Sequence, residues 1–489
     1  MNRDLLALSG QYFDLLVIGG GIFGAAVARD AALRGLRVAL IEKSDFASGT
    51  SSRTSKLIHG GFRYLQQRDF RLVFESCRER HILQQTAPHL VRPLPFLFPI
   101  YEGGEISLTT LRLGMSLYDW LALRRNVAPH QTLSVERTLM NEPSLSRKGL
   151  RGAVAFYDCQ EDDARFCIDH ILHVSELGAS CINYCSLTGL ITREDRIVAA
   201  RVRDEVGLCT FEISARVFVN ATGPWVEQVC GLTPFDAGAV RLSPAKGVHL
   251  VVPRLTRQHA IAFQARSDHR ILFVIPWGDY SLLGTTDTNF GGDPAQARVE
   301  QAEIDYLSAE ARAIFPDAPL SDSDVITTTV GVRSVAASAL ASPSARSREH
   351  RVVRTGRNLL SIIGGKYTTH RVIAQQTVDA TYGLLGVAAP PCRTAEVLVP
   401  NRRPAAAGEK ISEAPKVHAS DIIHACQQEM VVTLEDVMRR RTPLALSRAG
   451  GPEVASTVAH LMAPLMNWSS DEERSQFERY VEEWKRSLP

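Results

Sequence analysis

The chain has 489 residues and a net charge of +2, with 45% hydrophobic and 22% charged residues. This composition excludes collagen-like and low-complexity chains, and the length predicts a globular protein of about two to four domains. The near-neutral balance gives no global field that favours nucleic acid, so we expect no nucleic-acid partner. Nine cysteines without a CxxC pair favour reduced thiols and no metal site.

The beginning of the chain carries no predicted targeting or membrane-spanning segment. Residues 1–14 lack the apolar core of a signal peptide, and the most apolar stretch, residues 15–28, has 14 residues of which four are glycine. A membrane-spanning helix needs about 18 apolar residues. We therefore expect a cytoplasmic protein that is neither exported nor inserted across a bilayer.

A βαβ unit opens the chain. The apolar run Leu15–Ile18 predicts a strand, the Ala-rich stretch Ile22–Leu33 predicts a helix, and Gly35 stands where that helix would end. Val38–Ile41 predicts a second strand, which Glu42 terminates. Strand, glycine turn, helix and strand in this order are typical of an α/β fold.

The next segment with a clear helical pattern is Leu108–Arg125. Leu111, Met115, Tyr118 and Leu121 fall at helical spacing, and Arg124 and Arg125 close the segment. A helix that packs on the core is the favoured interpretation. An interfacial helix that lies on a membrane is the alternative.

Further strands and a change of composition divide the rest of the chain. Short apolar runs at 217–219, 272–275, 282–283 and 359–363 predict buried strands. From Pro390 to about Pro415 the sequence is rich in Pro, Ala and charge, which predicts a linker. The remainder to Pro489 is rich in helix formers and predicts a small helical domain without a convincing strand.

The first glycine turn has the pattern of a dinucleotide site. Gly19, Gly21 and Gly24 follow a strand and open a helix, so the backbone can approach a pyrophosphate and the helix N-terminus can offer N–H donors. Glu42 lies 18 residues beyond Gly24, where a carboxylate accepts hydrogen bonds from the ribose hydroxyls of an adenosine. Thr50, Ser51 and Ser52 follow soon after, and we expect their hydroxyls to bond phosphate oxygens or the ribityl chain.

The motif alone does not separate NAD from FAD. Two more glycine turns follow predicted strands, one at Asn220–Trp225 with Thr222 and Gly223, and one at Gly364–Lys366. Three such turns far apart in the chain favour one long, fixed cofactor, a flavin rather than an exchangeable nicotinamide. A helix N-terminus at Gly365 would direct N–H groups at the flavin pyrimidine and stabilise the reduced anionic ring.

The segment Ser55–Leu65, SKLIHGGFRYL, resembles a signature of FAD-dependent glycerol-3-phosphate dehydrogenases. Further matches occur in the same order along the chain, from about residue 13 to 385: Asp162–Arg165, Asn220–Trp225, Lys246–His249, Ile275–Trp277, Gly284–Asp287, Gly331–Arg333 and Gly364–Arg371. The chain is thus identified as similar to this family, within the superfamily of glycine-oxidase-like and D-amino-acid-oxidase-like flavoproteins.

The resemblance implies an α/β fold with three parts. A discontinuous Rossmann-like FAD-binding domain is expected over residues 12–88, 148–235 and 324–388. A substrate-binding domain with an antiparallel sheet is expected over 89–147 and 236–323. A linker, 389–415, and a C-terminal helical domain, 416–489, complete the chain.

The resemblance also implies an activity and partners. In the family, sn-glycerol 3-phosphate loses a hydride from carbon 2 to flavin N5, dihydroxyacetone phosphate forms, and the electrons pass to a membrane quinone. The cofactor is then FAD, and the enzyme would be peripheral on the cytoplasmic face of the cell membrane. Whether it forms a homodimer is left open.

The site residues that the resemblance implies fall into two groups. A phosphate dianion needs charge-assisted donors from Arg or Lys. The expected substrate-binding residues are Arg63, Tyr64, Arg333, Lys366, Thr369 and Arg371. The expected cofactor-binding residues, besides the glycines, Glu42 and the 50–52 hydroxyls, are Lys56, Leu57, His59, Thr222, Gly223, Gly364, Gly365 and Thr368.

The catalytic expectation concerns two residues. Removal of a hydroxyl proton suits a His with a pKa near neutral. His249 and His59 both lie in matching motifs, and we favour His249 as base or hydrogen-bonding partner because His59 precedes Gly60 and Gly61 and suits a turn beside the flavin. Arg333 is expected to share the role by lowering the pKa of the hydroxyl.

Two features depart from the pattern or add to it. After Arg333 the family continues with Pro and Leu, whereas Ser334 and Val335 follow here, and Ala336–Ser344 is an uncharged run. Five arginines lie within residues 346–357, for which a solvated hairpin is the default interpretation and a patch facing anionic lipid is the alternative.

Two other functions stay open on the sequence. One is a related flavoprotein that oxidises another polyol phosphate, a 2-hydroxy acid or an amine, with oxygen as a further candidate acceptor; the changed residues after Arg333 motivate it. The other is a non-catalytic FAD-binding redox sensor or assembly factor.

Overall fold

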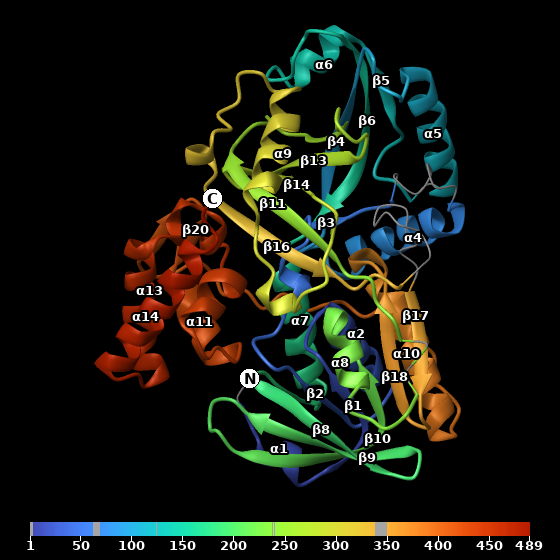
Figure 1. The fold of residues 1–489 in the computed structure, drawn as a ribbon, viewed down its shortest axis with the longest axis vertical. Coiled ribbons are helices and arrows are strands. Elements are labelled where there is room, and N and C mark those ends of the chain that lie inside the picture. The colour runs from blue at the N-terminus through green and yellow to red at the C-terminus, as the bar shows by residue number, and fades with distance from the viewer. Residues whose placement is uncertain (1–2, 62–68, 124, 237, 239, 338–349) are drawn as a thin grey trace.

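The computed structural model describes residues 3–61, 69–123, 125–236, 238, 240–337 and 350–489. Two lobes, each built on one large sheet, lie one above the other, and a helical domain lies beside the junction between them (Figure 1). The lower lobe contains the N-terminal βαβ unit, and the upper lobe contains the long antiparallel strands.

The lower sheet has the order β17-β18-β10-β1-β2-β7, and β9 and β8 extend it from β10. Its central strands β18, β10, β1, β2 and β7 are parallel. The bounds are β1 Tyr12–Ile18, β2 Val38–Ile41, β7 Ser180–Ile182, β8 Cys185–Arg193, β9 Arg196–Asp204, β10 Thr210–Asn220, β17 His350–Thr355 and β18 Leu359–Gly364. The predicted strands at 15–18, 38–41, 217–219 and 359–363 are confirmed.

Three helices cover one face of the lower sheet: α2 (Ile22–Leu33), α7 (Asp163–Glu176) and α10 (His370–Leu385). Apolar side chains of all three pack on the buried strands in one continuous core. The close packing of α2 on β1 depends on Gly24, because a Cβ there would lie 1.9 Å from the carbonyl oxygen of Gly19. Gly35 follows α2 with a φ of +89°, as expected of a glycine at a helix end.

The opposite face of this sheet is closed by α1 (Leu6–Ser9) and by the antiparallel strands β8 and β9. Short helices and turns connect the remaining strands of the lobe: η1 Thr50–Ser52, η2 Gly223–Trp225, α8 Val226–Cys230 and η6 Tyr367–Thr369. The arginine-rich stretch is an antiparallel hairpin, β17 with β18, in the part that the structure describes, and Arg351 and Arg354 are exposed on it. Arg346 and Arg348 lie outside the described residues.

The upper sheet has the order β15-β11-β14-β13-β12-β4-β6-β3, with β16 paired to β11 and β5 paired to β6. All printed pairings in it are antiparallel except that of β12 with β4. The bounds are β3 Leu57–Ile58, β4 Arg92–Tyr101, β5 Gln131–Leu133, β6 Leu150–Gln160, β11 Ala245–Pro253, β12 Ala260–Gln264, β13 Ile271–Trp277, β14 Tyr280–Gly284, β15 Thr288–Asn289 and β16 Thr327–Arg333.

Helices cover both faces of the upper sheet. On one face lie α4 (Phe70–Thr86) and α5 (Leu108–Leu121), and α5 buries Leu111, Met115 and Tyr118 as expected of a core helix. On the other face lies α9 (Gln301–Arg312). The shorter elements are α6 Val135–Asn141, η3 Pro294–Gln296 and η4 Asp322–Asp324.

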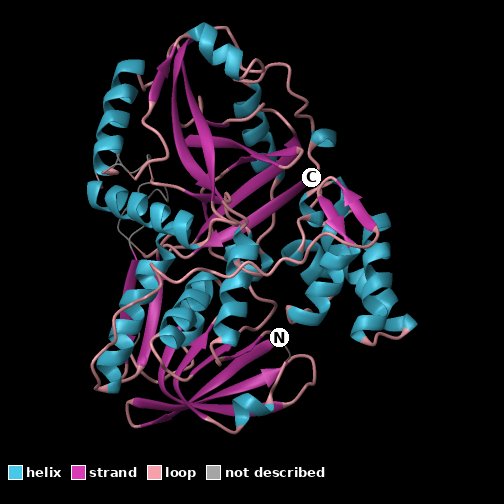
Figure 2. Cartoon of the chain, turned by 180° about the vertical axis from the view of Figure 1, so that it is seen from behind, coloured by secondary structure: helices cyan, strands magenta, loops and turns pink. Residues whose placement is uncertain are grey.

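The C-terminal domain is helical and has its own core. Its elements are α11 Ala419–Gln428, α12 Leu434–Asp436, the π-helical turn η7 Val437–Arg441, η8 Leu444–Leu446, η9 Arg448–Gly450, α13 Pro452–Met466 and α14 Ser470–Lys485. A hairpin, β19 (Lys410–Glu413) with β20 (Lys416–His418), precedes them, which the sequence pattern did not predict. Figure 2 shows the domain beside the two lobes, seen from behind.

The sheets differ from the expected domain boundaries at three places. The expected FAD-binding segments 12–88, 148–235 and 324–388 include β3, β6 and β16, yet all three strands pair in the upper sheet, β3 with β6. The physical reason is antiparallel pairing with β4 and β11, a long-range partnership that local apolar patterns do not reveal. The predicted linker is anchored: Arg29 donates to the carbonyl of Val397, and Val399 N donates to that of Thr86.

Candidate active site

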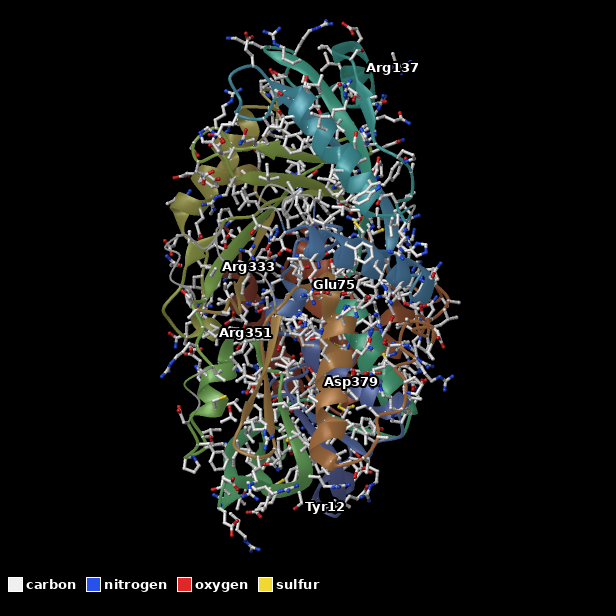
Figure 3. All side chains as sticks on the ribbon, turned by 90° about the vertical axis from the view of Figure 1, so that its right-hand side faces the viewer. Tyr12, Glu75, Arg137, Arg333, Arg351 and Asp379 are labelled. Atoms are coloured by element: carbon white, nitrogen blue, oxygen red, sulfur yellow. The ribbon has the colours of Figure 1, made fainter. Side chains whose placement is uncertain are left out.

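A cavity of about 1200 Å³ lies between the two sheets and reaches the C-terminal domain. The carboxyl ends of β1, β2, β10 and β18 form its floor, which is where open α/β sheets bind ligands. Strands β11 and β16 of the upper sheet form the opposite wall. Figure 3 shows Arg333, the last residue of β16, at mid-height of the molecule, between the labelled ends at Arg137 and Tyr12.

The glycine turns and their neighbours line the floor of this cavity. Of the expected cofactor-binding residues, the structure brings Gly19, Gly21, Glu42, Thr50, Ser51, Leu57, His59, Thr222, Gly223, Gly364, Gly365 and Thr368 to its wall. The expected residues Gly24, Ser52 and Lys56 are not among the lining residues. Gly24 instead lets α2 approach β1, as described above.

The start of α2 suits an anionic ligand. Its N-cap, Gly21, provides no side-chain cap, and a Cβ there would meet Ser51 Oγ at 3.0 Å. Ser51 Oγ accepts a hydrogen bond from Ile22 N at 2.9 Å. This bond holds the turn Thr50–Ser52 against the N-terminus of α2. A helix N-terminus that opens into a cavity and has a glycine without a side chain at its N-cap is the arrangement that binds pyrophosphate.

Glu42 is held by backbone donors at the end of β2. Its Oε2 accepts from Gly20 N at 2.7 Å and its Oε1 from Ser44 N at 3.0 Å. Burial raises the pKa of Glu42, and these two N–H groups act in the opposite direction. The carboxylate is therefore fixed at the cavity wall, in the place expected for a ribose partner.

The other two glycine turns follow the neighbouring parallel strands β10 and β18. Gly364 and Gly365 have φ values of +71° and +95°, so the helical geometry begins only at Tyr367, and α10 at His370. The helix N-terminus expected at Gly365 therefore lies further along the chain. His59 N donates to Thr368 Oγ1 at 3.2 Å, which joins the third turn to the SKLIHGG segment.

His249 and Arg333 lie on adjacent strands of the opposite wall and both line the cavity. His249 Nε2 lies 2.9 Å from the hydroxyl of Ser55, another lining residue, whereas its Nδ1 is buried and has no hydrogen-bond partner among the residues that the structure describes. Burial, followed by the positive charges of Arg333 and Lys56, lowers the pKa of His249 to about 3. The imidazole is therefore neutral at physiological pH.

Arg333 is oriented by its neighbours. It donates to Asp287 Oδ1 at 2.7 Å and to Thr285 Oγ1 at 3.1 Å. A Cβ at Gly247 would lie 2.6 Å from a guanidinium nitrogen of Arg333, so this glycine on β11 provides the room for the arginine. Asp287 lies in the GTTD motif, Gly284–Asp287, but no local pattern in the sequence indicates that it pairs with Arg333.

The expected substrate-binding residues separate into three sets. Arg333 and Lys366 line the cavity, and Lys366 is buried. Ser334, at which the sequence departs from the family pattern, lines the cavity as well. Thr369 and Arg371 do not line it: the Arg371 guanidinium makes a bidentate ion pair with Glu79 of α4, with both bonds at 2.6 Å. Arg63 and Tyr64 lie outside the described residues.

Lys56 also differs from the expectation of a cofactor contact. Its ammonium is buried, pairs with Asp163 at the start of α7, and lies 4.8 Å from the centre of the Trp277 ring. It therefore joins the upper and lower lobes. In the part of the chain that the structure describes, no group of three or more His, Cys, Asp or Glu side chains could hold a metal ion.

Comparisons with known proteins agree with this geometry. Residues 14–371 match the family described as FAD dependent oxidoreductase, and residues 392–473 match the C-terminal domain of alpha-glycerophosphate oxidase. The second match begins inside the expected linker, so most of that segment belongs to the C-terminal domain.

Relatives match over nearly the whole chain. A glycerol-3-phosphate dehydrogenase from Synechocystis is 32% identical over 98% of both chains. Glycerol-3-phosphate dehydrogenase 2 from Mycobacterium tuberculosis is 33% identical over 95% of this chain and 86% of its own. An aerobic glycerol-3-phosphate dehydrogenase from Staphylococcus saprophyticus is 36% identical over 76% of this chain and 67% of its own.

Two solved structures with FAD bound are similar to this chain in fold. The glycerol-3-phosphate dehydrogenase from Bacillus halodurans, complexed with FAD, superposes with a TM-score of 0.79 at 27% identity over 99% of this chain and 96% of its own. L-alpha-glycerophosphate oxidase from Mycoplasma pneumoniae, with FAD bound, has a TM-score of 0.61 over 80% of this chain and all of its own, and at 17% identity shows the fold alone.

Proposed function

The chain belongs to the family of FAD-dependent glycerol-3-phosphate dehydrogenases, and we propose that it oxidises sn-glycerol 3-phosphate to dihydroxyacetone phosphate and passes the electrons to a quinone. The observation that carries the proposal is the pair His249 and Arg333, which line the wall opposite the glycine turns of the cofactor site. FAD, when bound, supplies the acceptor for the hydride that leaves the substrate.

The residues of the wall fit the two tasks that the reaction sets. Arg333 and Lys366 give the cavity the positive charge that a phosphate dianion or a developing alkoxide requires. We add Arg63 and Tyr64 to this set on the resemblance of the SKLIHGGFRYL segment. Asp287 fixes one nitrogen of Arg333, so the guanidinium is positioned before the substrate arrives.

His249 is the residue to which we assign the hydroxyl proton, at its Nε2. This nitrogen faces Ser55 at the cavity wall, whereas Nδ1 is buried. Because the pKa of His249 is lowered, the imidazole is neutral and can accept a hydrogen bond from the substrate hydroxyl. Its weak basicity makes it a partner that orients the hydroxyl and receives its proton only as the hydride leaves.

The test is the visible spectrum of the purified holoprotein under anaerobic conditions, before and after addition of sn-glycerol 3-phosphate. Loss of the oxidised flavin band at about 450 nm would support the proposal. A flavin that dithionite reduces but sn-glycerol 3-phosphate does not would contradict it. A parallel panel of another polyol phosphate, a 2-hydroxy acid and an amine identifies the related oxidoreductase, and a flavin that none of them reduces identifies the non-catalytic alternative.

We further propose that the enzyme reaches its quinone from the surface of a membrane, through an apolar face on α4 and α5. No helix in the described ranges is long and apolar enough to cross a bilayer. This α4–α5 face consists of the exposed side chains Phe70, Phe74, Leu113, Leu117 and Trp120. Exposed apolar side chains in such number mark an interaction site.

The charge around the α4–α5 face favours a bilayer that contains anionic lipid. Arg71, Arg78 and Arg112 are exposed on the same two helices, and the Arg125 guanidinium lies 5.4 Å from the ring centre of Phe74. Basic residues near such a surface contribute up to about 1 kcal/mol each. The cytoplasmic face is the leaflet that this charge would meet.

Co-sedimentation with vesicles tests the face directly. Phosphatidylglycerol vesicles should retain the wild-type protein, phosphatidylcholine vesicles should retain less, and a Leu113→Ser, Trp120→Ser double variant should lose most of the binding. Leu208→Ser, at another highly exposed leucine, is the matched control and should bind as wild type. Equal retention of all three proteins would contradict this surface.

A further inference from the structure

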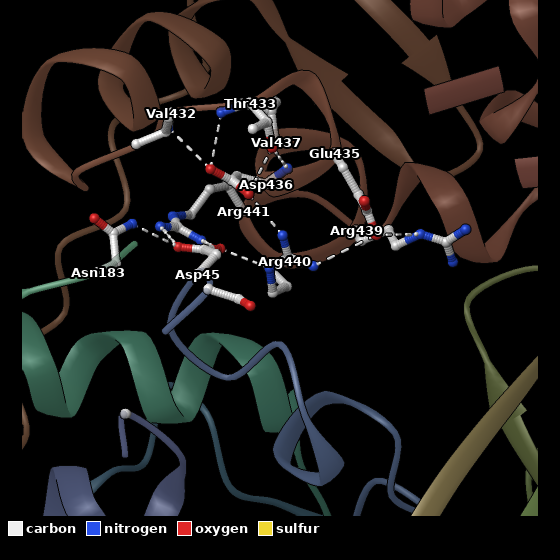
Figure 4. A network of polar contacts seen from close by, with 12 residues as sticks. Asp45, Asn183, Val432, Thr433, Glu435, Asp436, Val437, Arg439, Arg440 and Arg441 are labelled. Atoms are coloured by element: carbon white, nitrogen blue, oxygen red, sulfur yellow. Dashed lines mark hydrogen bonds and ion pairs between the residues drawn. The ribbon is translucent and has the colours of Figure 1, made fainter. Parts of the chain in front are cut away.

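A buried ionic cluster joins the C-terminal domain to the loop that follows β2. Asp45 of that loop is fully buried and accepts hydrogen bonds from Arg440 Nε at 2.6 Å and from Arg441 at 2.6 and 2.9 Å. Figure 4 shows the two guanidiniums from the C-terminal domain converging on this one carboxylate. Asn183 Nδ2 donates to the same group at 3.0 Å.

The cluster extends on both sides of Asp45. On the C-terminal side, Arg440 also donates to Asp436 at 2.7 Å, and Arg441 to the carbonyl of Glu429 at 2.8 Å. On the lower lobe, Tyr184 donates to Asp436 at 2.6 Å. Every charge in the group has a partner of opposite sign, which is the condition under which buried charges are tolerated.

Electrostatics make Asp45 dependent on the two arginines. Burial alone would raise the pKa of Asp45, but Arg441 and Arg440 outweigh it and lower the pKa to about 2. If the charges of the two arginines were removed while the C-terminal domain stayed docked, this buried carboxylate would keep Asn183 as its one remaining side-chain donor among the described residues. The loop would then have to leave its position to hydrate the charge.

The loop that Asp45 anchors is the adenosine side of the cofactor cavity. Glu42, Lys43, Ser44, Asp45, Ser48 and Gly49 all line it. Ala47 N donates to the carbonyl of Gly20, and Glu42 accepts from Gly20 N, so this loop sets the position of the first glycine turn. Tyr184 N donates to the carbonyl of Ser44. Because the Tyr184 hydroxyl donates to Asp436, Tyr184 connects the 42–49 loop to the C-terminal domain as well.

We infer that the C-terminal domain is part of the cofactor site, and that Arg440 and Arg441 are positioning residues that hold the 42–49 loop, through Asp45, in the conformation that binds the adenosine half of FAD. Neither arginine needs to touch the cofactor. Binding of FAD and docking of the C-terminal domain are then coupled, and each strengthens the other by the same factor. This inference rests on the ribose assignment of Glu42 in the proposed function.

Titration of the apoprotein with FAD, followed by flavin fluorescence, tests the coupling. Asp45→Asn and Arg441→Gln should each raise the Kd for FAD by about tenfold, a typical coupling between two sites. Arg441→Lys keeps the charge and should recover part of the loss. KM for sn-glycerol 3-phosphate, measured at saturating FAD, should stay near the wild-type value, because the substrate end of the cavity is unchanged.

Arg439→Gln is the matched control. Arg439 is the preceding residue of the same turn and carries the same charge, but it pairs with Glu435 and does not contact Asp45. It should leave the Kd for FAD unchanged. An equal rise in Kd for Arg439→Gln and Arg441→Gln would overturn the inference, because it would show a general effect of charge or of domain stability.

Two measurements separate the possible failures. Glu42→Gln should weaken FAD binding. If it does and Arg441→Gln does not, the positioning role of Arg441 is wrong, while the assignment of Glu42 to the ribose stands. If Glu42→Gln has no effect, the ribose assignment itself is wrong. Hydrogen exchange of the wild-type protein needs no variant: FAD should slow exchange at residues 434–445 as well as at 42–49, and unchanged exchange at 434–445 would overturn the coupling.

Discussion

The two ends of the cavity differ in what lines them: backbone at one end and side chains at the other. The proposed cofactor end consists mainly of backbone at glycine turns. A Cβ would lie 2.7 Å from the Ala221 carbonyl oxygen at Gly19 and 3.0 Å from Ser51 Oγ at Gly21, and Gly223 and Gly364 have positive φ values of +59° and +71°. The substrate end consists of charged and polar side chains on β11 and β16, held by partners such as Asp287. At the backbone-lined end, we expect an added side-chain atom to displace the backbone. At the side-chain-lined end, we expect a substitution of similar size to remove the reactive group and leave the fold intact.

The largest effect should come from an added methyl group at the cofactor end. In Gly24→Ala the new Cβ would lie 1.9 Å from the Gly19 carbonyl, so α2 must move away from β1. We expect loss of bound FAD and a decrease of about 1–3 kcal/mol in the free energy of unfolding. The absorbance ratio of flavin to protein and urea unfolding measure the two effects.

Gly114→Ala is the control for this change. A Cβ at Gly114, within α5, would meet no atom of the described ranges within 4 Å. Alanine there should retain FAD and stabilise the protein by up to about 1 kcal/mol. A flavin content of Gly24→Ala equal to that of this control would remove the contrast between the two ends.

At the substrate end, His249→Gln should keep the flavin and lose rate. We expect kcat/KM to fall by about 10²–10⁴, the usual contribution of a proton acceptor. The pKa of native His249 is about 3, so the wild-type rate should show no descending limb from this residue between pH 8 and pH 5. A limb in that range that disappears in His249→Gln would contradict the lowered pKa.

His249 also affects stability with a defined sign. Burial, with Arg333 and Lys56, lowers its pKa from about 6.5 in the unfolded chain. Below that value the unfolded chain binds a proton that the native protein does not, so the free energy of unfolding decreases as pH falls from about 6.5 towards 3. Urea unfolding of His249→Gln over this range should show a smaller decrease than the wild type.

A smaller effect is expected from Asp287→Asn. The amide can still accept a hydrogen bond from Arg333, but without the charge that fixes the guanidinium. We expect kcat/KM to fall by about tenfold, since charge-assisted hydrogen bonds are roughly twice as strong as neutral ones. Steady-state kinetics with intact flavin content measure it, and a loss as large as that of His249→Gln would show that Asp287 does more than orient Arg333.

The smallest effect on activity should be that of Arg371→Lys. Arg371 matches the family motif yet pairs with Glu79 away from the cavity. Lysine should leave KM and kcat unchanged and lower the free energy of unfolding by about 1.5–3 kcal/mol, because one of two bonds to a charged group is lost. A raised KM would indicate that Arg371 contacts the substrate, and it would weaken the contrast between the cofactor end and the substrate end of the cavity.

Local pattern was enough to bring most residues of the proposed cofactor end to one cavity, but it indicated the contacts of the proposed substrate end only in part. The turn at Gly19 and the acid at Glu42 follow each other within one βαβ unit, so periodicity and spacing suffice to place them. The pair of Arg333 with Asp287 and the cluster around Asp45 join residues 46 and more than 390 positions apart. Such pairs depend on which strands and domains meet, and no local signal specifies them.

The strand order of the lower sheet has a consequence for synthesis. β1 lies between β2 and β10, and the register pairs Leu15 with Val217 and Phe218 with Leu359. A nascent chain therefore presents β1, α2 and β2 long before β10 and β18 exist, and the floor of the cavity is complete only once β18 has left the ribosome. Until β10 is made, the apolar edge of β1 that will pair with it is a surface that chaperones can hold.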